Sequence, residues 1–184
     1  MHNRLIMKTK NIFKLKTAFF SGIILFFIFL ISVLFFNQIR TNPDISLIEN
    51  PNKIAPTFTT SQINGEKYVF NFESKLPTVI TFWASWCPPC RKEMPILDEI
   101  QKENDSIRII GINIDEDIGD AKEFISQYNI SFLSLIDEEF ITIKYGVTKI
   151  PETFFIDPEG KIISRVSGNL TKDKIKLLID DLVN

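Results

Sequence analysis

A run of 19 uncharged residues near the N-terminus is the feature that most restricts how this chain can fold. Residues 18–36 read AFFSGIILFFIFLISVLFF, and their only polar side chains are Ser21 and Ser32. A helix of this length spans about 28 Å, close to the hydrocarbon thickness of a bilayer. The run has no amphipathic face, which argues against a helix buried in a globular core. The sequence therefore predicts a transmembrane helix at residues 18–36.

A cleavable signal peptide is the competing interpretation of this run. Such a peptide has an apolar region of about 7–15 residues, followed by small residues at a cleavage site. Here the run is longer and ends in the bulky residues Val33–Phe36. We therefore predict an uncleaved signal-anchor.

The charges on either side of the run predict its orientation. Residues 1–16 carry five cations and no acidic residue, whereas Arg40 is the only cation that closely follows the run. Because Lys and Arg are enriched on the cytoplasmic side, we expect residues 1–17 to be the cytoplasmic tip of a single-pass protein. Residues 37–53 would be a polar tether. Residues 54–184 would form one domain on the far side of the membrane.

The composition of the chain disfavours several classes of function. Residues 41–184 hold all 23 Asp and Glu residues but only 15 of the 21 Lys and Arg residues. A domain this acidic is a poor partner for a phosphate backbone, so we expect no nucleic-acid partner. The single histidine, His2, lies in the basic tip, which argues against Ser–His–Asp or Cys–His catalysis and against His-rich metal sites in the domain.

The pattern of apolar residues in the domain predicts an α/β fold. An Asn64-Gly65 step between two short strands at residues 57–60 and 67–72 is a hairpin signal. Further strands are expected at residues 78–83, 107–114, 132–135, 153–156 and 162–166, with helices at residues 88–102, 121–128 and 140–145 and after Thr171. This order predicts a mixed sheet with both faces covered.

The only two cysteines, Cys87 and Cys90, lie where a buried strand passes into a helix. A helix N-terminus stabilises a thiolate through its unpaired N–H groups and its dipole. Two intervening residues bring the second sulfur within bonding reach of the first. We expect Cys87 to be the exposed attacking thiol and Cys90 the resolving thiol of a thiol–disulfide exchange.

Three other interpretations compete for this pair. A structural zinc site needs further ligands, and the domain has no other cysteine and no histidine. Inert core thiols would not explain the spacing of the two residues at a helix start. A purely structural disulfide that closes so short a loop would constrain little of the unfolded chain. We therefore predict a redox-active pair that needs neither a metal nor an organic cofactor.

Two motifs in the domain resemble the membrane-anchored thioredoxin-like reductases of cytochrome c maturation. They are FWASWCPPCRKEMP at Phe82–Pro95 and GVTKIPETFFIDPEGKI at Gly146–Ile162. The segments Ala55–Phe58 and Ile63–Lys67 also resemble the extra N-terminal hairpin of that group. The resemblance covers about residues 55–183. It implies a thioredoxin fold with an extra N-terminal β-hairpin, preceded by one transmembrane helix.

The resemblance also implies roles for individual residues. Cys87 and Cys90 match the redox pair, and Pro151 matches the cis-proline that faces it. A cis bond at this proline would leave the backbone of Ile150 free to pair with a substrate strand. The substrate-binding residues expected on this basis are Trp86, Ile150, Pro151 and Glu152. For Glu152 the alternative is an ordinary acid at a strand edge.

Glu93 is the third catalytic residue that the resemblance implies. Thioredoxins have a buried Asp six residues before the first cysteine, where this sequence has Thr81. The acid that moves protons would therefore have to be Glu93. A carboxylate partly screened from water has a raised pKa and can accept or relay the proton of Cys90 near neutral pH. The alternative is a solvated helix carboxylate.

By this resemblance, the domain reduces the oxidised CxxCH pair of apocytochrome c, or another client with a CxxC pair, before haem attachment. Its electrons would come from a transmembrane thiol reductase. The resemblance also implies that the domain lies on the periplasmic, outer side of the bacterial cytoplasmic (inner) membrane. Two other functions remain open on the same fold. One is a general envelope disulfide oxidant or isomerase, and the other is a non-catalytic chaperone for apocytochrome or copper-site assembly. A single cysteine pair without an exported His or Met cluster argues against copper.

Overall fold

The computed structural model describes residues 22–33 and 53–183, which fall in two compact units, Met1–Asn42 and Pro43–Asn184. In the first unit, residues 22–33 form a helix whose side chains are exposed. Within the described parts of the chain, no helix combines the length and the apolar content that a membrane crossing requires. The predicted span extends at both ends beyond this helix. Residues 18–21 and 34–36 lie outside the described residues, as do the tip and most of the tether.

The second unit opens with the predicted hairpin. Strands β1 (Phe58–Ser61) and β2 (Lys67–Phe70) pair antiparallel and form a two-stranded sheet of their own. In the turn between them, Asn64 Oδ1 accepts a hydrogen bond from the backbone N–H of Glu66 over 3.0 Å. Gly65 has a φ of 95°, a conformation that glycine adopts without steric cost. The prediction of an N-terminal hairpin is confirmed.

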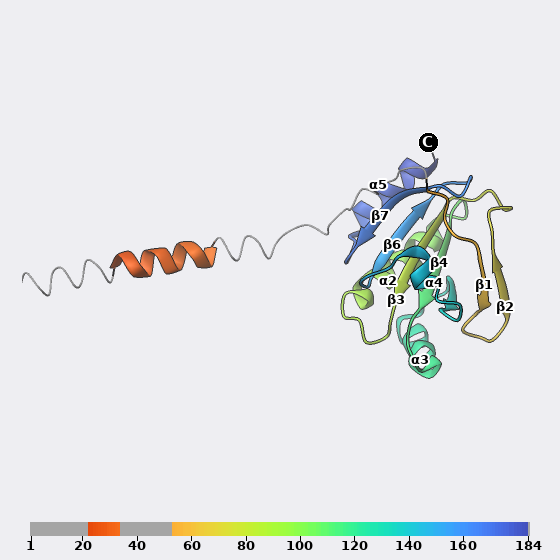
Figure 1. The fold of residues 1–184 in the computed structure, drawn as a ribbon, viewed down its shortest axis with the longest axis horizontal. Coiled ribbons are helices and arrows are strands. Elements are labelled where there is room, and N and C mark those ends of the chain that lie inside the picture. Colours follow the sequence, from red (N-terminus) through yellow and green to blue (C-terminus); the bar gives the residue numbers. More distant parts are fainter. Residues whose placement is uncertain (1–21, 34–52, 184) are drawn as a thin grey trace, which may run out of the picture. The chain divides into compact units, whose positions relative to one another are not determined.

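A five-stranded mixed sheet forms the centre of this unit (Figure 1). Its strands are β3 (Thr78–Trp83), β4 (Arg108–Asn113), β5 (Leu133–Ile136), β6 (Glu152–Ile156) and β7 (Ile162–Ser167), in the order β5-β4-β3-β6-β7. Strand β4 pairs parallel with β3 and β5, whereas β6 pairs antiparallel with β3 and β7. Every position of β3 is buried, as its apolar sequence predicts for a central strand.

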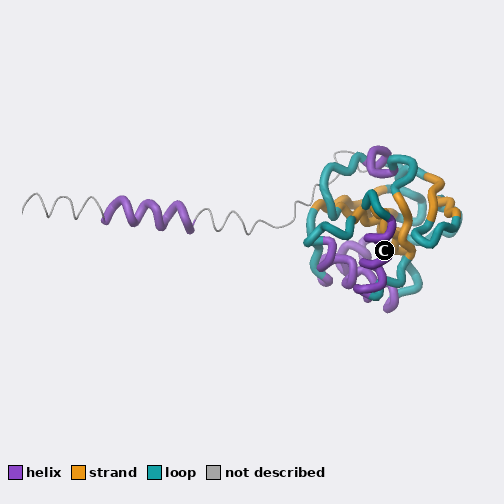
Figure 2. The backbone as a smooth tube through the Cα atoms, turned by 90° about the horizontal axis from the view of Figure 1, so that it is seen from below, coloured by secondary structure: helices purple, strands orange, loops and turns teal. Residues whose placement is uncertain are grey.

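Helices and the hairpin cover the two faces of this sheet (Figure 2). The helices are α2 (Cys90–Glu103), α3 (Ile118–Tyr128), α4 (Ile141–Tyr145) and α5 (Lys172–Val183). One apolar cluster joins α2, α3 and α5 to Val79 and Trp83 of β3, and the other joins the hairpin and α4 to Ile80 and Phe82. Alternate residues of β3 therefore enter opposite cores. The predicted α/β architecture with both faces covered is confirmed.

Two helix starts carry the polar residues expected of them. Before α3, Asp117 Oδ1 accepts a hydrogen bond from the N–H of Gly119 over 2.7 Å. Before α5, which begins after Thr171 as predicted, the hydroxyl of Thr171 accepts from the N–H of Lys174. Both satisfy backbone donors that have no partner within the helix.

Candidate active site

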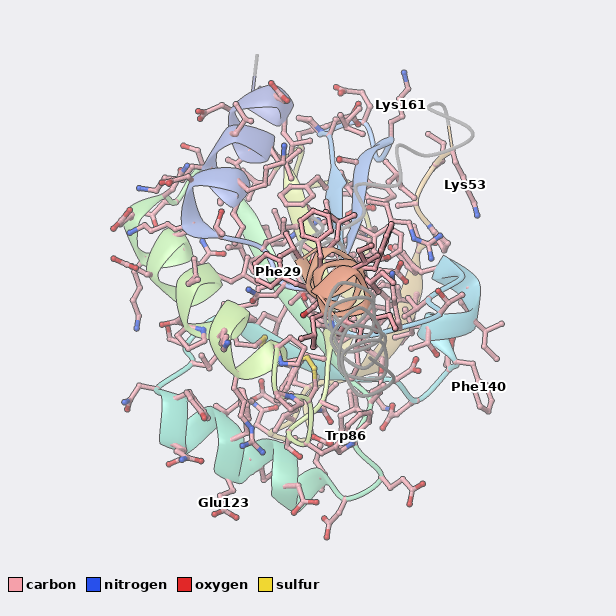
Figure 3. The ribbon with its side chains drawn as sticks, turned by 90° about the vertical axis from the view of Figure 1, so that its left-hand side faces the viewer. Phe29, Lys53, Trp86, Glu123, Phe140 and Lys161 are labelled. Atoms are coloured by element: carbon pink, nitrogen blue, oxygen red, sulfur yellow. A yellow bond between two sulfur atoms is a disulfide. The ribbon has the colours of Figure 1, made fainter. Side chains whose placement is uncertain are left out.

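Cys87 and Cys90 form a disulfide, with 2.01 Å between the two sulfur atoms (yellow in Figure 3). Cys87 lies in the loop after β3, and Cys90 is the first residue of α2. The backbone N–H of Cys90 donates to the sulfur of Cys87 over 3.3 Å. The positive end of α2 therefore acts on Cys87, the arrangement that favours a thiolate there once the bond is reduced.

The expectation that Cys87 is exposed is wrong for this structure. Cys87 is 2% exposed and Cys90 0%, and both belong to the apolar cluster beneath α2. The disulfide explains the difference, because it holds the sulfur of Cys87 against that of Cys90. Trp86, the preceding residue, is 60% exposed and forms the surface next to the disulfide.

Two charged residues that sequence reasoning missed hold the loop before Cys87. The carboxylate of Asp115 accepts from the backbone N–H of Ser85 over 2.9 Å and from its hydroxyl over 3.1 Å. Arg91 donates from Nε and Nη2 to the carbonyl of Ser85, each over 3.2 Å. The backbone N–H and the backbone C=O of Ser85 are therefore both hydrogen-bonded to charged side chains. Asp115 follows β4, which is parallel to β3, so Asp115 and the loop after β3 lie at the same edge of the sheet. This shared position is the sequence signal from which Asp115 could have been identified.

The Ile150–Pro151 peptide bond is cis, as the resemblance implied. Pro151 is buried and its carbonyl accepts from the N–H of Gly168 over 2.8 Å. Ile150 is half-buried, and its backbone N–H and C=O form no hydrogen bond with any described residue. This leaves one donor and one acceptor available to an incoming extended peptide.

Glu93 lies inside the protein, so the alternative of a solvated carboxylate is excluded. Its side chain is on α2, one turn beyond Cys90, and is 1% exposed. Oε1 accepts from the hydroxyl of Thr153 over 2.7 Å, and Oε2 accepts from the N–H of Leu170 over 2.7 Å. Burial raises the pKa of Glu93 from its ordinary value of 4.5 to about 7, although these hydrogen bonds act to lower it. Glu93 can therefore exchange a proton near neutral pH.

Thr81, which occupies the position of the thioredoxin Asp, is linked to Glu93 through Thr153. The two hydroxyl oxygens of the threonines are 3.0 Å apart, and the residues are partners in the β3–β6 pairing. A hydroxyl has one proton to donate. When Glu93 is ionised, Thr153 donates to Glu93 and Thr81 donates to Thr153. When Glu93 is protonated, both hydroxyls can turn to donate in the opposite direction.

Glu152 is also buried, at 1% exposure, and is not an ordinary acid at a strand edge. Arg165 donates to its two oxygens from Nε over 2.9 Å and from Nη2 over 3.0 Å. Its carboxylate also accepts from the hydroxyl of Ser167 and from the N–H of Thr148. Arg165 in turn donates to the carbonyl of Gly146 over 2.6 Å. Arg165, which sequence reasoning missed, and Glu152 thus hold the segment that leads into the cis-proline.

Ile150 packs against the apolar cluster that contains Cys87 and Cys90, so the structure brings the cysteine pair and the cis-proline segment together. Glu93 and Glu152 are both buried. Because Glu152 and Thr153 are successive residues of β6, Glu152 points to the sheet face opposite the one on which Thr153 meets Glu93. Among the residues that the structure describes, no cluster of three or more His, Cys, Asp or Glu side chains could hold a metal ion.

A thioredoxin-like fold with a disulfide at the start of a helix and a nearby cis-proline defines a thiol–disulfide oxidoreductase. The sequence profile of the AhpC/TSA family matches residues 51–165. The thiol-disulfide oxidoreductase ResA of Bacillus thuringiensis subsp. konkukian is 34% identical over 127 residues, which are 67% of this chain and 73% of that protein. The thioredoxin-like protein YneN of Bacillus subtilis is 31% identical over 130 residues, 68% of this chain and 76% of that protein.

Solved structures agree with this assignment. A secreted Mycobacterium tuberculosis disulfide oxidoreductase homologous to E. coli DsbE superposes with a TM-score of 0.63 at 27% identity, covering 68% of this chain and 96% of that one. DsbF of the same organism gives a TM-score of 0.62 at 28% identity, over 68% and 94% of the two chains. The chain belongs to the AhpC/TSA family and, within it, to the thiol–disulfide oxidoreductases related to ResA and DsbE.

Proposed function

We propose that this oxidoreductase works as a reductant, and that its client is the CxxCH disulfide of apocytochrome c. The observation that carries the direction of the reaction is the buried carboxylate of Glu93, one helical turn from Cys90. An anion at this place disfavours a thiolate and so destabilises the reduced pair relative to the disulfide. Strong oxidants of this fold do the opposite, because they stabilise their reduced form. The client is proposed from the two motifs and from the ResA and DsbE relatives.

The proposed reaction is two successive thiol–disulfide exchanges. In the reduced protein, the thiolate of Cys87 attacks one client sulfur, the client S–S bond breaks, and the released client thiolate takes a proton from water. Cys90 then gives its proton to Glu93 and attacks the sulfur of Cys87. The mixed disulfide between Cys87 and the client breaks, the Cys87–Cys90 disulfide seen here forms, and the second client sulfur leaves as a thiolate that takes a proton from water. Two electrons pass to the client.

The oxidised protein must then be reduced by a dithiol donor through the same exchanges in reverse. We propose a transmembrane thiol reductase as that donor, and a location on the outer face of the bacterial cytoplasmic membrane. The uncharged run at residues 18–36 and the five cations that precede it support this location. On this proposal the run is an anchor, residues 1–17 are cytoplasmic, and residues 37–53 tether the domain.

Ile150 is the proposed docking point for the client backbone. Its free N–H and C=O can pair with an extended client segment that places its disulfide at Cys87.

Trapping tests the client assignment. In a Cys90→Ser variant the mixed disulfide on Cys87 cannot be resolved internally, so it should accumulate in cells as a covalent adduct with a CxxCH protein. A Cys87→Ser/Cys90→Ser variant is the matched control and should capture nothing. Recovery of only general secreted disulfide proteins would overturn the cytochrome assignment and favour the general oxidant or isomerase.

A further inference from the structure

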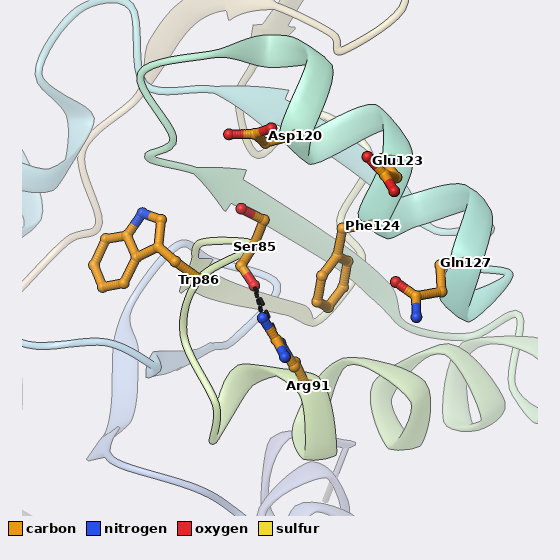
Figure 4. A pocket seen from close by; sticks show the side chains of 7 residues that line it. All are labelled: Ser85, Trp86, Arg91, Asp120, Glu123, Phe124 and Gln127. Carbon is orange, nitrogen blue, oxygen red and sulfur yellow. Dashed lines mark hydrogen bonds between the residues drawn. The ribbon is translucent and has the colours of Figure 1, made fainter.

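A cavity of about 340 Å³ opens beside the redox centre, between the loop that carries Trp86 and helix α3 (Figure 4). Trp86 and Arg91 line it on the side of the disulfide, and Asp120, Glu123 and Phe124 line it from α3. Trp86 directly precedes Cys87 and Arg91 directly follows Cys90, so the cavity lies next to the segment that carries the disulfide. The mechanism proposed above makes no use of it.

The charges around this cavity are unbalanced. Asp120 and Glu123 lie one helical turn apart, are exposed, and form no side-chain hydrogen bond or ion pair with any described residue. The guanidinium of Arg91 is the only cation in the lining, and it is held against the carbonyl of Ser85 by two hydrogen bonds of 3.2 Å (Figure 4). The two carboxylates without a partner and the single guanidinium give the cavity a net negative charge.

The aromatic lining adds a second requirement. The indole of Trp86 is largely exposed, and Phe124 forms part of the wall. Lys and Arg side chains have long apolar stems that lie along such surfaces, while their charged ends seek anions or the faces of aromatic rings. An acidic side chain in the same place would be repelled by Asp120 and Glu123. A short neutral side chain would leave the carboxylates without a partner.

We propose that this cavity binds a Lys or Arg side chain of the client, in the segment next to the cysteine that Cys87 attacks. The inference rests on the proposed function, because it assumes that a client disulfide docks at Cys87. The cavity would then make the protein prefer disulfides that are flanked by basic residues.

Matched disulfide substrates test this preference. We would prepare three peptides that share one internal disulfide and differ only in the flanking residue, which is Lys, Gln or Glu. The fourth substrate is 2-hydroxyethyl disulfide, which is uncharged and has no flanking residue. The reduced full-length protein in detergent should react about two- to fivefold faster with the Lys peptide than with the Gln peptide, and more slowly with the Glu peptide. Raising the salt concentration to about 0.5 M should reduce the difference.

Two double variants in the cavity and one control variant outside it assign the preference to the cavity. The Asp120→Asn/Glu123→Gln variant should lose it, yet react with 2-hydroxyethyl disulfide at the wild-type rate. An Asp120→Lys/Glu123→Lys variant should prefer the Glu peptide. The control is Asp105→Asn/Glu159→Gln, which removes the same charge at two exposed residues outside the cavity and should keep the wild-type preference.

The possible failures are distinguishable. Equal rates for the three peptides in the wild type, or a preference that survives in both cavity variants, would overturn the cavity proposal while leaving the reductase function intact. A reduced protein that reacts with none of the four disulfides would overturn the proposed function and this inference with it.

Discussion

The hydroxyl of Thr153 donates to the carboxylate of Glu93 over 2.7 Å, and this bond joins the strand after the cis-proline to the helix that begins at Cys90. Thr153 is two residues beyond Pro151, and Glu93 is three residues beyond Cys90. The two motifs singled out in the sequence therefore meet inside the protein.

The thiol pKa should fall when the charge of Glu93 is removed. A Glu93→Gln variant keeps the shape of the side chain but no longer repels a thiolate, so we expect a lower apparent pKa for the Cys87/Cys90 pair and weaker reduction of the client in cells. Thiolate absorbance of the reduced protein, followed between pH 5 and pH 10, measures this. Superimposable curves for variant and wild type, with client reduction intact, would show that Glu93 is only structural.

The stability of the oxidised protein should also depend on Glu93. Its pKa is about 7 in the folded state and 4.5 in its ordinary state, so the folded protein binds the proton more tightly than the unfolded chain does. Its contribution is therefore fully present below about pH 4.5 and is lost as the pH rises through about 7. We expect the Glu93→Gln variant to lack this decrease, which is about 3 kcal/mol on this pKa difference. Urea unfolding of both proteins at several pH values between 4 and 8 measures it, and parallel curves would contradict it.

A Thr153→Val variant should lose the hydroxyl that donates a hydrogen bond to the buried carboxylate of Glu93. The substitution preserves the shape of the side chain, but it leaves Oε1 of Glu93 without its hydrogen bond. We expect a loss of about 1–3 kcal/mol in the free energy of unfolding, larger at pH 8, where Glu93 is ionised, than at pH 5. Denaturant titrations at the two pH values would detect this. Thr59→Val, at an exposed position of β1, is a control for the substitution itself.

Arg165→Met should destabilise the protein and impair client reduction. The substitution leaves Glu152 charged and buried without its partner, which costs about 3–5 kcal/mol in comparable cases. It also frees the carbonyl of Gly146, so the segment before the cis-proline loses its attachment. A Glu152→Gln/Arg165→Met variant should recover part of the stability, because no buried charge remains. Unfolding and insulin reduction, measured side by side, test this, and a double variant less stable than the single one would contradict it.

The reduction potential separates the proposed reductase from a general oxidant. A reductant should have a potential closer to that of thioredoxin, about −270 mV, than to that of DsbA, about −120 mV. Glu93→Gln should move the potential towards the oxidising value, since it favours the thiolate. Equilibration with a dithiothreitol redox buffer measures both proteins. A wild-type value near −120 mV would favour the oxidant.

Local sequence patterns predicted much of this architecture. Strand β3 was identified at its observed bounds because every residue in it is apolar or β-branched, and the hairpin turn was identified from Asn64-Gly65. The cis bond at Pro151 and the importance of Glu93 came from the resemblance, since no local pattern marks either of them.

The interactions that were missed join residues far apart in the chain. Asp115 binds Ser85 across 30 positions, and Arg165 binds Glu152 across 13, so each depends on how strands are placed in the sheet. The burial of Cys87 was missed for a different reason. The argument from helix geometry describes a free thiol, whereas the sulfur here is bonded to Cys90. The predicted membrane span and its orientation stay predictions.

The unpaired backbone of Ile150 has a consequence for how this protein would choose among clients. Peptide N–H and C=O groups are the same in every protein, so docking there accepts any extended segment and cannot discriminate between sequences. Selectivity must then come from side-chain contacts elsewhere, of which the charged cavity beside Trp86 is the candidate. Substitutions in the cis-proline segment would slow the reduction of every client to the same extent. Substitutions on α3 would instead change which client is reduced fastest.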